Sequence, residues 1–133
     1  MESTNAGVSG RRILVIDDRV DSLALTQIIL QHLGHEVEVA SSGEEGVSRA
    51  LTFIPDLVLC DLAMPGMDGI EVAKRLRSEP ATRNAILIAV TGHDEEEDKA
   101  RTKEAGFDHH LTKPVQFEVL ERLAASNGGG RPH

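Results

Sequence analysis

The sequence predicts an α/β fold in which a five-stranded parallel sheet lies between two layers of helices. Short aliphatic runs alternate with longer stretches of helical spacing, and this alternation occurs five times after residue 12. Polar residues follow the aliphatic runs at one end only, which is the pattern of parallel strands whose carboxyl ends share one edge. These two observations favour a (βα)5 chain with its chemistry at the carboxyl edge of the sheet.

Three of the five aliphatic runs are apolar throughout, and two are not. The expected strands, in chain order, are 13–16, 36–40, 57–60, 85–90 and 109–111. The first, third and fourth have the composition of parallel strands covered on both faces, whereas the second alternates Glu with Val and the fifth is weak. We therefore expect strand order 2-1-3-4-5, with the second and fifth strands at the edges.

Helical spacing follows each of these strands. The expected helices are 20–33, 43–52, 69–77, a fourth that begins at Asp94, and 116–125. The first has apolar residues at roughly helical spacing, namely Val20, Leu23, Ala24, Ile28 and Leu30. Gly34 supplies its stop.

The fourth helix should be the least firmly packed of the five. Asp94 followed by Glu97 is a start signal for a helix. Only Ala100 and Ala105 are expected to face the core. A helix with so little apolar surface is easier to displace than its neighbours.

Length and charge disfavour several classes of protein. The chain has 133 residues, which fits one domain over 11–126 with disordered tails over 1–10 and 127–133. Its net charge of −8 repels phosphate backbones and its aromatic content is 2%, so direct nucleic-acid binding is disfavoured. The apolar runs are too short to span a membrane, Cys60 has no second cysteine to pair with, and the first residues carry no export signal. We therefore expect a cytoplasmic protein without membrane contact.

Three carboxylates are expected at one point of the sheet edge. Asp17 and Asp18 follow the first strand and Asp61 follows the third, and in the expected order these strands are neighbours at the switch point. Carboxylates gathered in this way raise each other's pKa unless a cation holds them. Because an all-oxygen set of ligands suits Mg²⁺, the sequence predicts a magnesium site.

Two further residues fit phosphoryl chemistry at the same edge. An Asp can attack phosphorus to form an aspartyl phosphate, while a metal bridges oxygens and a Lys neutralises the developing charge. Lys113 and Thr91 follow the fifth and fourth strands, where the ammonium can contact phosphoryl oxygens and the hydroxyl can donate to one of them. The loop 64–69, with two glycines, supplies tight turns beside Asp61.

These motifs together resemble one known family. The segments that carry the resemblance are Ile13-Leu-Val-Ile-Asp-Asp18, Pro55-Asp-Leu-Val-Leu-Cys-Asp61, Met64-Pro-Gly-Met-Asp-Gly69, Val90-Thr91 and Lys113-Pro114. In this order and spacing they resemble the receiver domain of two-component response regulators, over residues 11–126. The resemblance implies a flavodoxin-like three-layer fold.

The resemblance also implies a role for each acidic residue of the site. By it, Asp61 is the phospho-acceptor and Asp18 is a direct Mg²⁺ ligand. Asp17 acts on the ion largely through water. The backbone carbonyl of Ala63, two residues past the acceptor, is a further ligand.

The phosphate-sensing residues include departures from the best-known members of the family. The resemblance implies that Thr91 and Lys113 sense the phosphoryl group and that the Lys113-Pro114 bond is cis. Three residues before Lys113, where such domains usually carry an aromatic switch residue, this chain has His110. Two residues past Thr91 it has His93. The run 105–114 looks most like receivers attached to hybrid sensor kinases.

The expected function is that of a phospho-accepting signalling domain. It would take a phosphoryl group from a phosphohistidine on a sensor histidine kinase or a histidine phosphotransfer protein, and its surface would then change. The face of the fourth helix and fifth strand is a candidate surface for a downstream partner. We expect no enzymatic turnover of an external substrate.

Two alternatives to this function remain open. One is a receiver-like interaction module that works without phosphorylation. The other is a Mg²⁺-dependent phosphohydrolase that turns over through an aspartyl phosphate. The hydrolase is the weaker, because Ala63 stands where such hydrolases usually place an Asp.

Overall fold

The computed structural model describes residues 10–92 and 96–125 of the chain. Within these residues five strands alternate with five helices. The strands are β1 (Arg12–Ile16), β2 (Glu36–Ala40), β3 (Leu57–Asp61), β4 (Ile86–Thr91) and β5 (His109–Thr112). The helices are α1 (Val20–His32), α2 (Gly43–Phe53), α3 (Gly69–Ser78), α4 (Glu96–Ala105) and α5 (Phe117–Ala125).

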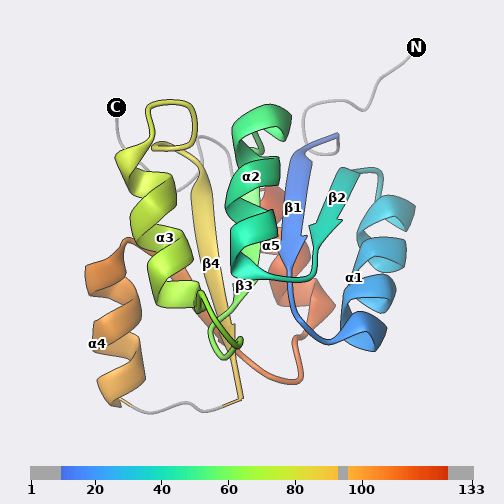
Figure 1. Cartoon of the computed structure of the whole chain (residues 1–133). Helices are drawn as coiled ribbons and strands as arrows, with labels where there is room; N and C mark the ends of the chain where they lie inside the picture. Colours follow the sequence, from blue (N-terminus) through green and yellow to red (C-terminus); the bar gives the residue numbers. More distant parts are fainter. Residues whose placement is uncertain (1–9, 93–95, 126–133) are drawn as a thin grey trace.

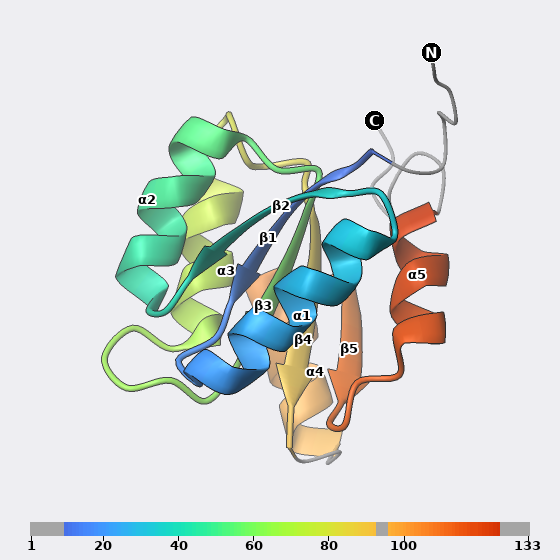
Figure 2. The same ribbon diagram turned by 90° about the vertical axis from the view of Figure 1, so that its right-hand side faces the viewer.

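All five strands run parallel in one sheet, in the order β2-β1-β3-β4-β5. Helices α2 and α3 cover one face of the sheet with α4 beside α3, and α1 and α5 cover the other (Figures 1 and 2). The predicted α/β class, the strand order and the flavodoxin-like three-layer arrangement are confirmed. The predicted helix start at Asp94 lies outside the described residues, as do the predicted tails apart from Gly10.

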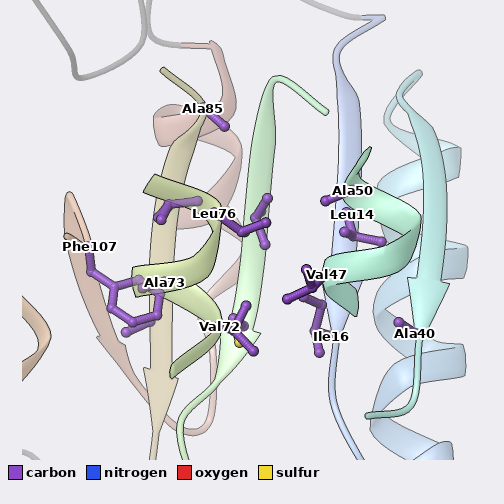
Figure 3. Close-up of a cluster of buried hydrophobic side chains, with 14 of the residues drawn as sticks. Leu14, Ile16, Ala40, Val47, Ala50, Val72, Ala73, Leu76, Ala85 and Phe107 are labelled. Atoms are coloured by element: carbon purple, nitrogen blue, oxygen red, sulfur yellow. The ribbon is translucent and has the colours of Figure 1, made fainter. Parts of the chain in front are cut away.

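Each face of the sheet carries its own hydrophobic cluster. Along β1, Leu14 and Ile16 belong to the cluster beneath α2 and α3, whereas Ile13 and Val15 belong to the one beneath α1 and α5. Figure 3 shows the first cluster, in which side chains of α2 and α3 meet those of the strands. Because β1, β3 and β4 are the inner strands, they are covered on both faces, as their continuous apolar sequence predicts.

Helix ends follow the expected local chemistry. The Ser42 hydroxyl accepts a hydrogen bond from the backbone N–H of Glu45 at the start of α2. The Asp68 carboxylate accepts one from Glu71 at the start of α3. Each satisfies a backbone donor that the helix itself leaves unpaired. Helix α1 ends before Gly34, whose φ of 99° is the left-handed conformation of a helix stop.

Helix α1 turns a different face to the sheet from the one that its spacing suggests. Leu23 and Leu30 are buried, but Ala24 is exposed, and Val20 and Ile28 are 69% and 61% exposed. The exposed residues recur every fourth position and so share one stripe of the helix. Helical spacing identifies residues that share a face, but it does not determine which of two apolar stripes meets the sheet.

In α4, the prediction that Ala100 faces the core is wrong. Ala105 is buried as expected, yet Ala100 is exposed, and Thr102 is buried at 2% exposure. Thr102 lies three residues before Ala105 and therefore shares its face, whereas Ala100 lies five residues away on another side. The Thr102 hydroxyl donates to the carbonyl of Lys99, so burial leaves it paired.

No helix in the described ranges is both long and apolar enough to cross a membrane.

Candidate functional site

Three carboxylates meet where β1 and β3 end. Asp61 is the last residue of β3, and Asp17 and Asp18 directly follow β1, which pairs with β3 in register. One carboxylate oxygen from each lies within 4.8 Å of the others. Asp17 and Asp61 are 9% and 4% exposed. The predicted convergence of these three residues is therefore present, and two of them are largely shielded from water.

The local backbone fixes Asp17 at the end of its strand. Its N–H donates to the carbonyl of Ala40 on β2 at 3.1 Å, and its Oδ1 accepts a hydrogen bond from the N–H of Arg19 at 3.0 Å. Burial raises the pKa of Asp17, and the nearby negative charge of Asp61 raises it further, against the lowering effect of the Arg19 N–H and of Lys113. The ionised site therefore stores repulsion that a bound cation would relieve.

Lys113, directly after β5, also reaches this cluster. Its Nζ lies 3.2 Å from Asp61 Oδ2, and its backbone N–H donates to the carbonyl of Thr91 at 2.7 Å. The Lys113-Pro114 peptide bond is cis, as the resemblance implies. Thr91 ends β4 and is 6% exposed. Lys113 and Thr91 therefore lie at the same sheet edge as the carboxylates.

The loop between β3 and α3 is tied to the carboxylate of Asp61. The N–H of Ala63 donates to Asp61 Oδ1 at 3.2 Å, and the N–H of Gly69 closes the loop on the carbonyl of Leu62 at 3.1 Å. The Met64 side chain is buried in the first hydrophobic cluster. Both oxygens of Asp61 thus have protein donors, one from this loop and one from Lys113.

His110 lies on β5, paired in register with Ala89 of β4. Its Nε2 is buried and has no hydrogen-bond partner within the part of the chain that the structure describes. The half-buried imidazole occupies the position that the resemblance gives to the switch residue, two residues before Thr112, which pairs with Thr91. His93, the other departure near Thr91, lies outside the described residues.

The donor set fits a hard divalent cation. The gathered side chains offer only carboxylate oxygens, which suit Mg²⁺ better than a soft metal. The neighbouring Cys60 offers no competing thiolate, because complete burial raises the pKa of its thiol and Asp61 raises it further. The side chains of Asp18 and Asp61 and the carbonyl of Ala63 are the groups that the resemblance assigns to direct coordination.

Sequence reasoning missed a groove of about 510 Å³ that leads away from the carboxylates. It runs between α1 and the segment that joins β5 to α5, and Asp17, Asp61 and Lys113 line one end. The residues that line the remainder include Arg19, Ser22, Leu25, Thr26, Pro114, Val115 and Phe117. The sequence signal for this groove was Leu25, an apolar residue of α1 that does not share the stripe of Leu23 and Leu30. In the structure Leu25 is 56% exposed.

Comparison with known proteins agrees with this geometry. A family model described as "Response regulator receiver domain" matches residues 13–125. The protein PilH of Pseudomonas aeruginosa is 38% identical over 109 residues, which cover 82% of this chain and 90% of PilH. The alkaline phosphatase synthesis transcriptional regulatory protein PhoP of Bacillus subtilis is 40% identical over 116 residues. This match covers 86% of the chain but only 48% of PhoP, so the chain spans about half the length of that relative.

Solved structures give the same result. The chemotaxis protein CheY4 of Vibrio cholerae superposes with a TM-score of 0.81 at 28% identity, covering 86% of this chain and 95% of CheY4. The receiver domain of a sensor histidine kinase from Pseudomonas aeruginosa PAO1 superposes with a TM-score of 0.80 at 26% identity, covering 87% and 95%. That structure is described as having a magnesium ion coordinated in its active site cleft.

Proposed function

The chain belongs to the response regulator receiver domain family, and from this premise we propose that Asp61 accepts a phosphoryl group from a phosphohistidine in a reaction that requires Mg²⁺. The observation that carries the proposal is the meeting of Asp17, Asp18 and Asp61 with Lys113 at one sheet edge. The result is a signalling domain that is modified once per event, with no turnover of an external substrate.

In the transfer step, a carboxylate oxygen of Asp61 attacks phosphorus. A P–O bond forms to the carboxylate as the P–N bond to the donor imidazole breaks, and the departing nitrogen keeps the electron pair and takes up a proton. When bound, Mg²⁺ supplies positive charge beside the phosphoryl oxygens, and Asp18, Asp61 and the carbonyl of Ala63 would hold it, with Asp17 acting through water.

The chain's own cation and hydroxyl complete the site. Lys113 Nζ, which lies at 3.2 Å from Asp61 Oδ2, is placed to neutralise charge on the transferred group. The Thr91 hydroxyl is placed at the same edge to donate to a phosphoryl oxygen. A movement of Thr91 toward that oxygen would also move β5, which pairs with β4 and carries His110. A change at the face formed by α4 and β5 would then be read by a downstream partner.

The phosphoryl donor would dock on α1. The stripe that contains Val20 and Ile28 is apolar and exposed, and Leu25 joins it to the groove that ends at Asp61. An apolar surface beside a reactive carboxylate suits a helical partner that carries a phosphohistidine, either a sensor histidine kinase or a histidine phosphotransfer protein. Partners of this kind would act in the cytoplasm, and the net charge of −8 disfavours binding to nucleic acid.

The test is intact mass spectrometry after incubation with acetyl phosphate. Wild type should gain one phosphoryl group with Mg²⁺ and none with a chelator. Asp61→Asn should gain none under either condition. Asp56→Asn serves as the matched control, because Asp56 lies at the other end of β3, where its carboxylate accepts from the N–H of Arg12, and it should behave as wild type.

Other outcomes separate the remaining functions. If the Asp61→Asn variant still gained an acid-stable, base-labile phosphate, the assignment of Asp61 as the acceptor would be overturned. No gain by wild type from acetyl phosphate or from a phosphorylated histidine phosphotransfer protein, together with no Mg²⁺ binding, would favour an interaction module that works without phosphorylation. Continuous release of phosphate from small phosphoesters would favour a hydrolase.

A further inference from the structure

The first residue of α2 touches the loop that follows Asp61. A Cβ at Gly43 would lie 2.9 Å from Cβ and 3.1 Å from the carbonyl carbon of Met67, and closer still to the Met67 carbonyl oxygen. Real Cβ atoms essentially never approach other atoms within 3.0 Å. Gly43 is buried in a helix, where Ala is favoured over Gly, so helix propensity does not explain a glycine here. The steric reason is the close approach of the loop.

Helix α2 is held at its start by hydrogen bonds and packs closely on the sheet. Its first turn is capped by Ser42, and the carboxylate of Glu45 accepts from the N–H of Ser41 at 2.8 Å. One turn further, a Cβ at Gly46 would meet the side chain of Ile16 on β1, so the helix already lies directly against the sheet. The capped first turn and the close contact with the sheet favour displacement of the loop over displacement of the helix.

The loop in turn is attached to the carboxylate site. Ala63 donates to Asp61 Oδ1, and Gly69 donates to the carbonyl of Leu62. A Cβ at Gly69 would lie 2.6 Å from the Asp61 carbonyl oxygen, so the closed end of the loop also rests on the acceptor's backbone. A shift of Met67 would therefore reach the carbonyl of Ala63.

We propose that Gly43 is a positioning residue for the metal site: the bare backbone at the start of α2 sets where the Met67 segment of the loop lies, and so where the Ala63 carbonyl stands relative to Asp61. This proposal rests on the proposed function in taking that carbonyl as a Mg²⁺ ligand. Mg²⁺ demands near-ideal octahedral geometry, whereas Ca²⁺ accepts flexible geometry with longer bonds. A displaced carbonyl should therefore weaken Mg²⁺ binding more than Ca²⁺ binding.

The test measures the dissociation constants of Mg²⁺ and of Ca²⁺ by titration calorimetry for wild type and for Gly43→Ala. The Mg²⁺ affinity of Gly43→Ala should fall about tenfold, the scale of a lost supporting contact at a metal site, with a smaller loss for Ca²⁺. Backbone amide resonances of residues 62–69 should shift in the metal-free variant. The matched control is Gly106→Ala, which strains a φ of 116° and would place a Cβ 2.7 Å from Arg77 Cγ, far from the carboxylates. It should lose stability yet keep the wild-type ratio of the two constants.

Each result is decisive. A ratio for Gly43→Ala within about twofold of wild type would overturn the proposal, since Mg²⁺ tolerates little displacement of its ligands. An equal change in Gly106→Ala would also overturn it, because the effect would then be general destabilisation. Failure of Gly43→Ala to fold would count against it too, since the proposal requires a displaced loop on an otherwise folded chain. Phosphorylation of wild type is measured separately, so that a chain that takes no phosphoryl group but shows the altered ratio would contradict the proposed function alone.

Discussion

The two ends of the sheet differ in how their charged side chains are paired. At the carboxyl end, Asp17, Asp18 and Asp61 lie together, and repulsion between two of them contributes to the raised pKa of Asp17. At the amino end, Arg77 lies in the last turn of α3 with a side chain that is mostly buried. It donates to the carbonyls of Gly106, Ala85 and Arg83. One end leaves charge ready for a ligand, and the other end satisfies it within the chain.

The amino end is a clamp between elements distant in sequence. Arg77 also pairs with Asp108 at 2.8 Å, and the same carboxylate oxygen accepts from the N–H of Leu87 on β4. These bonds join α3, β4 and the start of β5. Nearby, Arg12 donates to the carbonyl of Phe53 and lies over its ring, 4.3 Å from the centroid. The fold is therefore secured at the end where no chemistry is proposed.

The carboxyl end of the sheet is where the arrangement of charges lowers the stability of the fold. Grouping like charges in a shielded pocket opposes folding, and proteins accept this at functional sites. At the amino end, the hydrogen bonds and ion pairs of Arg77 and Arg12 stabilise the fold and offset part of that cost. Substitutions at the two ends should therefore have opposite effects on stability.

The largest effect is expected from breaking the clamp. Asp108→Ala should lower the free energy of unfolding by about 3 kcal/mol, because it leaves Arg77 without its carboxylate in a pair whose side chains are 13% and 8% exposed. Urea denaturation measures this loss, and phosphorylation at a temperature where the variant is folded should be unchanged. Glu38→Ala, which breaks an exposed pair with Arg49, should cost less than about 1 kcal/mol. Equal losses in the two variants would remove the distinction between the clamp and a surface ion pair.

A smaller effect of the opposite sign is expected at the carboxyl end. Asp17→Asn should raise the free energy of unfolding by about 1 kcal/mol at neutral pH, because it removes a shielded charge that repels Asp61. The sign follows from the raised pKa: the folded state disfavours ionised Asp17, so wild type should gain stability relative to the variant as pH falls toward 3.8. Denaturation and Mg²⁺ titration together test this, since Asp17→Asn should be more stable and bind Mg²⁺ more weakly. A destabilised variant would contradict the account of stored repulsion.

The smallest effect concerns His35, which precedes β2 at the amino end. Its burial lowers its pKa, the charge of Arg11 lowers it further, and Glu121 opposes both. A group with a lowered folded pKa is neutral in both states above its ordinary value of 6.5, and it costs stability as pH falls below that value because the unfolded chain binds the proton more readily. Wild type should lose stability over this range more steeply than His35→Gln. His32→Gln, on the exposed last turn of α1, should follow wild type, and parallel slopes for all three proteins would contradict the prediction.

The sequence predicted the carboxyl end better than the amino end, for a physical reason. Asp61 and Thr91 are the last residues of their strands, and Asp17 and Lys113 directly follow theirs, so the parallel sheet alone brings them to one edge. The Arg77–Asp108 pair joins residues 31 apart through a loop geometry that no periodicity encodes. The arginine of a helix's last turn reads in sequence as a solvated charge, and only the path of the following loops makes it a clamp.

Two further features of the structure, both involving helices, were not predictable from the sequence. Apolar spacing in α1 does not distinguish Leu23 and Leu30, which are buried, from Val20 and Ile28, which are not. The close contact between α2 and the loop after Asp61 also has no sequence signal except a glycine at position 43. Both features depend on which neighbour a face meets, and this is a property of the assembled fold.

The most direct measurement of the central claim is chemical trapping of the phosphorylated residue. Borohydride reduces an aspartyl phosphate to homoserine and leaves free carboxylates unchanged, so peptide mass spectrometry after phosphorylation and reduction identifies the acceptor. The account predicts conversion at Asp61 alone, dependent on Mg²⁺, in wild type and in the clamp variant Asp108→Ala alike. Conversion at Asp17 or Asp18, or the same degree of conversion with a chelator present, would contradict it.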